Sequence, residues 1–226
     1  MDIKIDPRKA TRYLLVLAIG FALTQAAGQL ISVHSGLIIG LSLFNPDRWQ
    51  SVSRCYSVIL LLLCSALFLA IAAARRKDGV NSFLPWFGLA LGFLSFAITK
   101  ETGIHENLAA LIRSSLGISK LQFYAWAYGI FLIIFILLYR KVFCNLPRKT
   151  LFSLAIGGSA FVVGAFGLDI LVAYLGNSYG HRAVAYIGLA TLEDGLEMIG
   201  TIVLIYGLLL YVSSEFTMIR VKITER

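Results

Sequence analysis

Apolar residues along this chain gather into six long runs that are separated by short polar segments. The runs extend over about 13–33, 55–74, 83–100, 121–139, 151–175 and 190–212. Each has about the length that an α-helix needs to cross a bilayer, which is roughly 20 residues. Because no segment between the runs is long enough for a soluble domain, the pattern predicts an all-α, polytopic membrane protein. We expect one transmembrane domain over residues 1–226.

The segment after the third run has a different pattern. Its apolar residues recur at helical spacing, and polar residues take the opposite side. These apolar residues are Ile104, Leu108, Leu111, Ile112 and Leu116. The spacing predicts a short amphipathic helix that lies in the outer membrane interface. Gly117 is placed to end this helix.

Composition and charge agree with a membrane protein and predict its orientation. Hydrophobic residues make up 58% of the chain and charged residues only 14%, whereas soluble domains are about a quarter charged. With a cytoplasmic N-terminus, 14 of the 20 lysines and arginines fall on the cytoplasmic side, as the positive-inside rule expects. We therefore predict cytoplasmic N- and C-termini and contact with the lipid bilayer. The net charge of +8 then indicates orientation, with attraction to anionic lipid as an additional effect, and we expect no nucleic-acid partner.

Polar residues that are unusual for a membrane span gather near the predicted outer ends of the runs. They are Gln25, Gln29 and His34; Glu101, His105 and Glu106; Asp169; and Glu193, Asp194 and Glu197. With Gly176 as the end of the fifth helix, Asp169 lies about 10 Å below that end. With Thr191 as the start of the sixth helix, Glu197 lies about 9 Å below that start. We therefore expect these two carboxylates at a similar depth.

A structural interpretation accounts for several of these residues. Thr191 and Asp194 fit a capping box, and Glu193 would complement the helix dipole. Asp169 and Glu197 lie beyond such caps, and ionisable groups at membrane depth usually have a partner or a function. In the structural interpretation they are protonated, or they pair with Arg182 or His105.

A second interpretation is a metal site. Carboxylates and imidazoles bind zinc, manganese or iron, and such a divalent metal could activate water for hydrolysis. The candidate ligands are Glu101, His105, Asp169, Glu193 and Glu197. Glu101 and His105 would share a face if the helix were continuous between them. The composition favours a metal, but the spacing contains no His-Glu-x-x-His motif.

Three stretches of the chain resemble an uncharacterised family of bacterial six-helix integral membrane proteins. They are GIHENL at 103–108, GAFGLDIL at 164–171 and LEDGLEMIG at 192–200. The family pattern is an Ile-His-Glu stretch after the third helix and a Glu-x-x-x-Glu-Met-[Leu/Ile]-Gly start to the sixth. The resemblance implies a bacterial inner membrane and marks His105, Glu106, Asp169, Glu193 and Glu197. Where the family has an acidic pair, this chain has Thr99-Lys100, which implies an altered or lost site.

Three functions are compatible with these observations. An accessory, structural or binding subunit, with other membrane proteins as partners, fits the short loops, the small-residue faces and the Thr99-Lys100 departure. A metal-dependent membrane enzyme that acts on a lipid or amphiphile fits the shared depth of Asp169 and Glu197. A transporter fits least, because the polar residues gather at one end and no inverted repeat is visible. We predict the accessory subunit and keep the other two as alternatives.

Overall fold

The computed structural model describes residues 6–35, 52–179 and 184–215, and the regular structure in this part of the chain is helical. The helices are α1 (Pro7–Ser35), α2 (Val52–Arg75), α3 (Val80–Thr102), α4 (Ile104–Leu116), α5 (Lys120–Cys144), α6 (Arg148–Val162), α7 (Asp169–Tyr179) and α8 (Val184–Glu215). The short 3-10 segment η2 (Arg76–Asp78) precedes α3, and the π-helical segment η3 (Val163–Leu168) joins α6 to α7. The predicted all-α class is confirmed.

Six stretches of these helices are long and apolar enough to cross a membrane. They are Pro7–Gly28, Val52–Arg75, Ser82–Thr102, Gln122–Cys144, Arg148–Val172 and Ala185–Glu215. Each overlaps one of the six predicted runs, and the fifth crosses from α6 through η3 into α7. The short helix α4 forms where the amphipathic pattern predicts it, and Gly117 ends it in the left-handed region at φ 66°.

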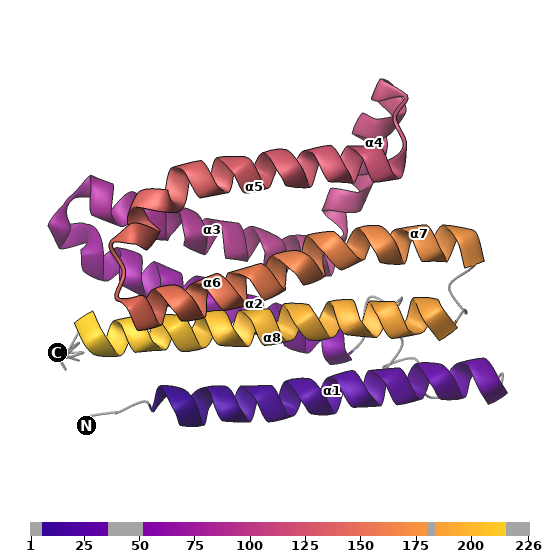
Figure 1. Cartoon of the computed structure of the whole chain (residues 1–226), viewed down its shortest axis with the longest axis horizontal. Helices are drawn as coiled ribbons and strands as arrows, with labels where there is room; N and C mark the ends of the chain where they lie inside the picture. The colour runs from indigo at the N-terminus through magenta and orange to yellow at the C-terminus, as the bar shows by residue number, and fades with distance from the viewer. Residues whose placement is uncertain (1–5, 36–51, 180–183, 216–226) are drawn as a thin grey trace, which may run out of the picture.

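Most of the described basic residues gather at one end of the helix bundle. In Figure 1, the starts of α1 and α6 and the ends of α2, α5 and α8 all lie at the left. These helix ends carry Arg8, Lys9, Arg12, Arg75, Arg76, Lys77, Arg140, Lys141, Arg148 and Lys149. We call this the basic end. The opposite end of the bundle holds α4 and the end of α7 (Figure 1). The observed grouping agrees with the charge pattern from which orientation was predicted.

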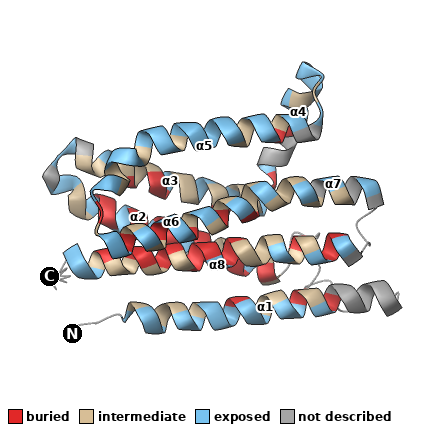
Figure 2. Cartoon of the chain, viewed as in Figure 1, coloured by how far each residue is buried: buried red, intermediate tan, exposed pale blue. Residues whose placement is uncertain are grey.

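Helix α8 forms the centre of the bundle because it contacts α1, α2, α6 and α7. Its residues Met198, Ile205 and Leu208 are at most 1% exposed, and Figure 2 shows most of the buried positions on α8 and its neighbours. At the basic end, Arg75 Nη2 lies 3.0 Å from Glu215 Oε2, which ties the end of α2 to the end of α8.

Two glycines allow α6 and α8 to approach closely. A Cβ atom at Gly200 would lie 2.5 Å from the backbone nitrogen of Phe161 and 2.8 Å from the carbonyl oxygen of Gly157. Backbone atoms cannot yield as a flexible side chain could, so only glycine fits at this crossing. Small residues at helix interfaces are the usual way in which membrane helices come together.

Candidate functional site

The three carboxylates of TLEDGLEMIG lie inside α8, and the predicted helix start at Thr191 is wrong. The chain is already helical at Val184, and the Thr191 hydroxyl donates to the Ile187 carbonyl at 2.9 Å. Thr191 is therefore not an N-cap, and Glu193 and Asp194 do not lie in the first turn. The capping interpretation fails for this physical reason, so these carboxylates need partners from other helices.

Lys100 from α3 is the cationic partner of two of them. Its Nζ contacts Glu197 Oε2 and lies 3.4 Å from Asp194 Oδ1. The side chain of Lys100 is 16% exposed and that of Glu197 is 10% exposed. An ammonium so placed offsets part of the cost of removing carboxylates from water. The contact also joins α3 to α8.

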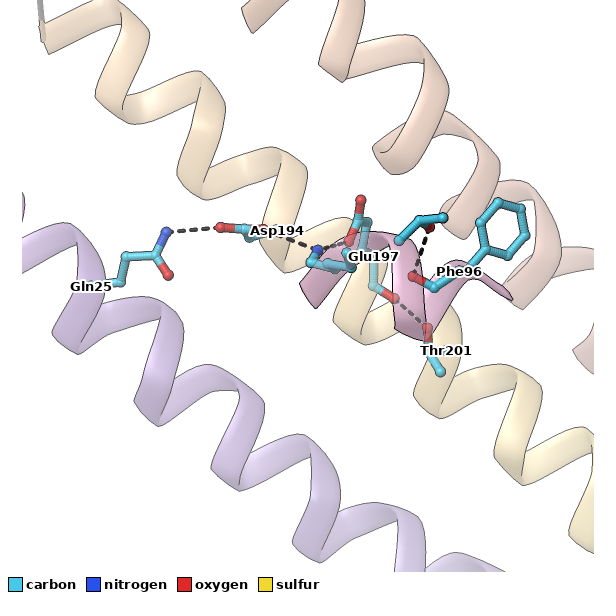
Figure 3. Close-up of polar contacts among 7 residues, drawn as sticks. Gln25, Phe96, Asp194, Glu197 and Thr201 are labelled. Atoms are coloured by element: carbon cyan, nitrogen blue, oxygen red, sulfur yellow. Dashed lines mark hydrogen bonds and ion pairs between the residues drawn. The ribbon is translucent and has the colours of Figure 1, made fainter. Parts of the chain in front are cut away.

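Gln25 from α1 completes what we call the polar cluster, which consists of Gln25, Lys100, Asp194 and Glu197. Gln25 is 1% exposed, and its Nε2 donates to Asp194 Oδ2 at 2.9 Å (Figure 3). Asp194 thus accepts from α1 and α3 at once. Gln25 Oε1 has no hydrogen-bond partner in the described part of the chain. The polar cluster therefore links three helices and retains one buried acceptor.

A second polar contact lies beside the polar cluster, between α5 and α7. Tyr128 donates its hydroxyl to Asp169 Oδ2 at 3.1 Å. Glu193 precedes Asp194 on α8, and a Cβ atom at Gly164 of η3 would lie 3.2 Å from its carbonyl oxygen, so Glu193 lies where η3 packs against α8. We call the polar cluster together with Tyr128, Asp169 and Glu193 the polar band. It crosses the bundle from α5 through α7 and α8 to α3 and α1.

The π-helical segment η3 brings the fifth span against α8 at this level. A Cβ atom at Gly164 would lie 3.0 Å from the backbone nitrogen and 3.1 Å from Cγ of Glu197. Asp169 follows directly after η3. The segment that carries Asp169 therefore packs against Glu197 through Gly164. The predicted end of the fifth helix at Gly176 is wrong, because α7 continues to Tyr179.

The described part of the structure does not bring the remaining predicted site residues into the polar band. Glu101 is exposed in the last turn of α3. Gly103, at φ 62°, ends α3, and the next helix begins at Ile104, so Glu101 and His105 do not share a continuous helix. The side chains of Gln29, His34, His105 and Glu106 lie outside the described part of the structure.

The described residues do not form a preformed metal site. In that part of the chain, no group of three or more His, Cys, Asp or Glu side chains is arranged to hold a metal ion. Lys100 already contacts two of the carboxylates that could act as ligands. A metal site that includes His105 stays a prediction.

Sequence reasoning missed two residues of the polar band. Lys100 was noted as a departure from the family pattern and was not considered as a partner. The signal was available, because several carboxylates within an apolar run require a nearby cation. Tyr128 gave no comparable signal, since tyrosine is common near the ends of membrane helices.

The fold and the polar band define a multi-pass, all-α membrane protein whose buried polar residues join its helices. A family model described as a domain of unknown function (DUF8692) matches residues 10–212, and the chain belongs to this family. The match covers every residue of the polar band. No curated protein and no solved structure matches the chain.

Proposed function

We propose that this protein is a structural or binding subunit of a larger membrane assembly, built as one transmembrane domain. In this proposal the polar cluster holds the helices in a fixed arrangement and does not catalyse a reaction. The observation that carries the proposal is the contact of Lys100 with Asp194 and Glu197. A buried ion pair with defined partners is well suited to fix the register of helices.

The contacts of the other helices explain why such a link is useful. Helix α3 packs mainly on α2, and α1 packs mainly on α8. Lys100 connects α3 to α8, and Gln25 adds a hydrogen bond from α1. Interhelical hydrogen bonds in membranes contribute about 0.6 to 2 kcal/mol each. The polar cluster therefore adds directional contacts to a bundle whose other contacts are mostly apolar.

Transport is supported less well. Beyond the polar band, towards the basic end, the centre of α8 is apolar and buried at Ile202, Ile205 and Leu208. A transporter requires polar groups or a cavity that serve both membrane faces in turn. We further propose that the basic end faces the cytoplasm of a bacterial inner membrane, as the positive-inside rule predicts.

A metal-dependent enzyme that acts on a lipid or amphiphile is the second candidate. The observation that favours it is an apolar cavity of about 550 Å³ whose lining includes Phe96 and Phe166, close in sequence to Lys100 and Asp169. In this alternative, Glu101, His105, Asp169, Glu193 and Glu197 would supply the ligands for zinc, manganese or iron.

Two measurements on protein purified at native abundance separate these candidates. Cross-linking mass spectrometry should recover a stoichiometric membrane partner of the wild-type chain. Metal analysis without added metal should show the same content in wild type, Glu197→Gln and Asp169→Asn. Glu215→Gln is the control, because Glu215 lies at the opposite end of α8. One equivalent of metal that disappears only in the Glu197 and Asp169 variants would overturn the proposal in favour of the enzyme.

A further inference from the structure

An elongated apolar cavity runs along the inner side of α5. Its volume is about 550 Å³, within the roughly 300–1,000 Å³ range of ligand pockets. Residues of α2, α3, α5, α6, η3 and α8 contribute to its lining, and among the described lining residues only Ser159 has a polar side chain. On α5 the lining extends from Phe131 to Phe143, a distance of about 18 Å at 1.5 Å per residue. The cavity is therefore long and apolar enough to hold a hydrocarbon chain.

The cavity opens sideways between α5 and α6. Leu132 and Ile136 on α5, and Ala155 and Ser159 on α6, line the cavity and are also exposed on the surface of the bundle. In a membrane-spanning bundle this apolar surface faces the hydrocarbon core of the bilayer. An acyl chain could enter from that side without crossing polar residues.

Three phenylalanines close the end of the cavity that lies next to the polar band. The ring centroids of Phe96, Phe131 and Phe166 are 5.7 to 6.3 Å apart. Phe166 also stacks on Tyr128, with centroids 4.3 Å apart. These aromatic contacts separate the apolar space from Asp169 and Glu193. The polar head of an occupant therefore belongs at the other end.

The other end of the cavity meets four exposed basic residues. Phe143 and Leu151 line the cavity there, and each follows an arginine by three residues, a helical spacing that places the two on neighbouring positions of one face. The four residues are Arg140, Lys141, Arg148 and Lys149. The first turn of α6 contains no acidic residue, so its helix dipole adds to the positive potential.

From this arrangement we propose that the α5–α6 connection is a binding site for an anionic phospholipid. One acyl chain lies in the cavity between α5 and α6, and the phosphate lies among Arg140, Lys141, Arg148 and Lys149. Charge complementarity selects an anionic head, because basic groups between membrane helices attract such lipids. Lipid binding here does not require the polar cluster to act as a helix link.

The test is native mass spectrometry of the full chain in a non-ionic detergent, titrated with dioleoyl phosphatidylglycerol or dioleoyl phosphatidylcholine. We expect the anionic phosphatidylglycerol to bind at least about tenfold more tightly than the zwitterionic phosphatidylcholine. Gly158→Leu should weaken its binding about tenfold by filling the cavity, since a Cβ atom there would meet only Leu204 Cδ2, at 4.0 Å. Arg148→Gln with Lys149→Gln should weaken it to a similar degree.

Matched controls test whether the site is specific. Gly20→Leu adds the same bulk on α1, where nothing lies within 4 Å, and Arg8→Gln with Lys9→Gln removes the same charge from α1. Both should bind as wild type. Equal binding of the two lipids, unchanged binding by the Gly158 variant, an equal loss in the controls, or displacement by glycerol phosphate alone would each overturn the proposal. Ala155→Leu replaces Gly158→Leu if the latter does not fold.

Discussion

Helices α8 and α5 have the same mean hydropathy in their most apolar stretches but opposite positions in the bundle. More than half of that stretch is buried in α8, whereas none of the corresponding stretch within Gln122–Cys144 of α5 is buried, although Tyr124 near the start of α5 is. Figure 2 shows the same contrast, with α5 mostly exposed along its length. Hydropathy alone therefore does not distinguish a central from a peripheral membrane helix.

Two features of α8 account for the difference. Gly200 lets α6 approach to backbone contact, whereas a Cβ atom at Gly129 of α5 would meet nothing within 4 Å. The carboxylates of α8 accept from Lys100 and Gln25 on two other helices. In lipid, where apolar residues gain little by leaving the solvent, small residues and polar contacts decide which helix is central.

Loss of the Lys100 ammonium should have the largest effect. Lys100→Met leaves Asp194 and Glu197 without their cation, and breaking a buried pair in this way costs about 3–5 kcal/mol. Thermal unfolding in detergent should show a fall of many degrees in Tm. Lys100→Arg should recover part of the loss, and Lys77→Met, at an exposed position, should have little effect. A Lys100→Met variant as stable as wild type would show that the polar cluster does not hold α3 to α8.

The two glycines provide a direct comparison of the two helices. Gly200→Ala forces a methyl group against the backbone of α6 and should cost about 1–3 kcal/mol, as overpacking does. Gly129→Ala should be neutral or slightly stabilising, since alanine favours the helix. Both are measured by the same thermal unfolding assay. Equal effects of the two substitutions would contradict the assignment of α8 as the close-packed helix.

The hydrogen bond from α1 should contribute less. Gln25→Leu removes the Nε2 donor to Asp194, and we expect the free energy of unfolding to fall by about 0.6 to 2 kcal/mol. Thr24→Val is the neighbouring control, because the Thr24 hydroxyl is exposed and donates within α1 to the Gly20 and Phe21 carbonyls. If both variants unfold at the same temperature, Gln25 does not secure α1 to α8.

The smallest expected effect concerns α5. Tyr128→Phe removes the hydroxyl that donates to Asp169 but keeps the ring that stacks on Phe166. The free energy of unfolding should therefore fall by about 0.6 kcal/mol. In the variant, the rate of amide hydrogen exchange should nevertheless be higher in α5 than in α8. Uniform exchange rates in the variant would indicate that packing alone holds α5.

The sequence predicted the helices well because about 20 consecutive apolar residues have few alternatives to a membrane span. It failed at Thr191, where a local capping motif lies within a helix that tertiary packing extends to Val184. It predicted a similar membrane depth for Asp169 and Glu197. It did not pair Lys100 with Glu197, because this pairing depends on how α3 and α8 lie relative to each other. The cavity beside α5 is a property of helix placement, which hydropathy does not report.

The π-helical segment η3 also sets the rotation of α7 about the axis of the fifth span. In an uninterrupted α-helix, Asp169 would point about 140° away from Gly164, five residues earlier. A π-helix pairs residues five apart, so the wider turn moves Asp169 back towards the side on which Gly164 packs against α8. Restoring regular α-helical turns over Val163–Leu168 without removing a residue would turn the carboxylate away from the polar band while leaving the span apolar and long enough to cross the membrane.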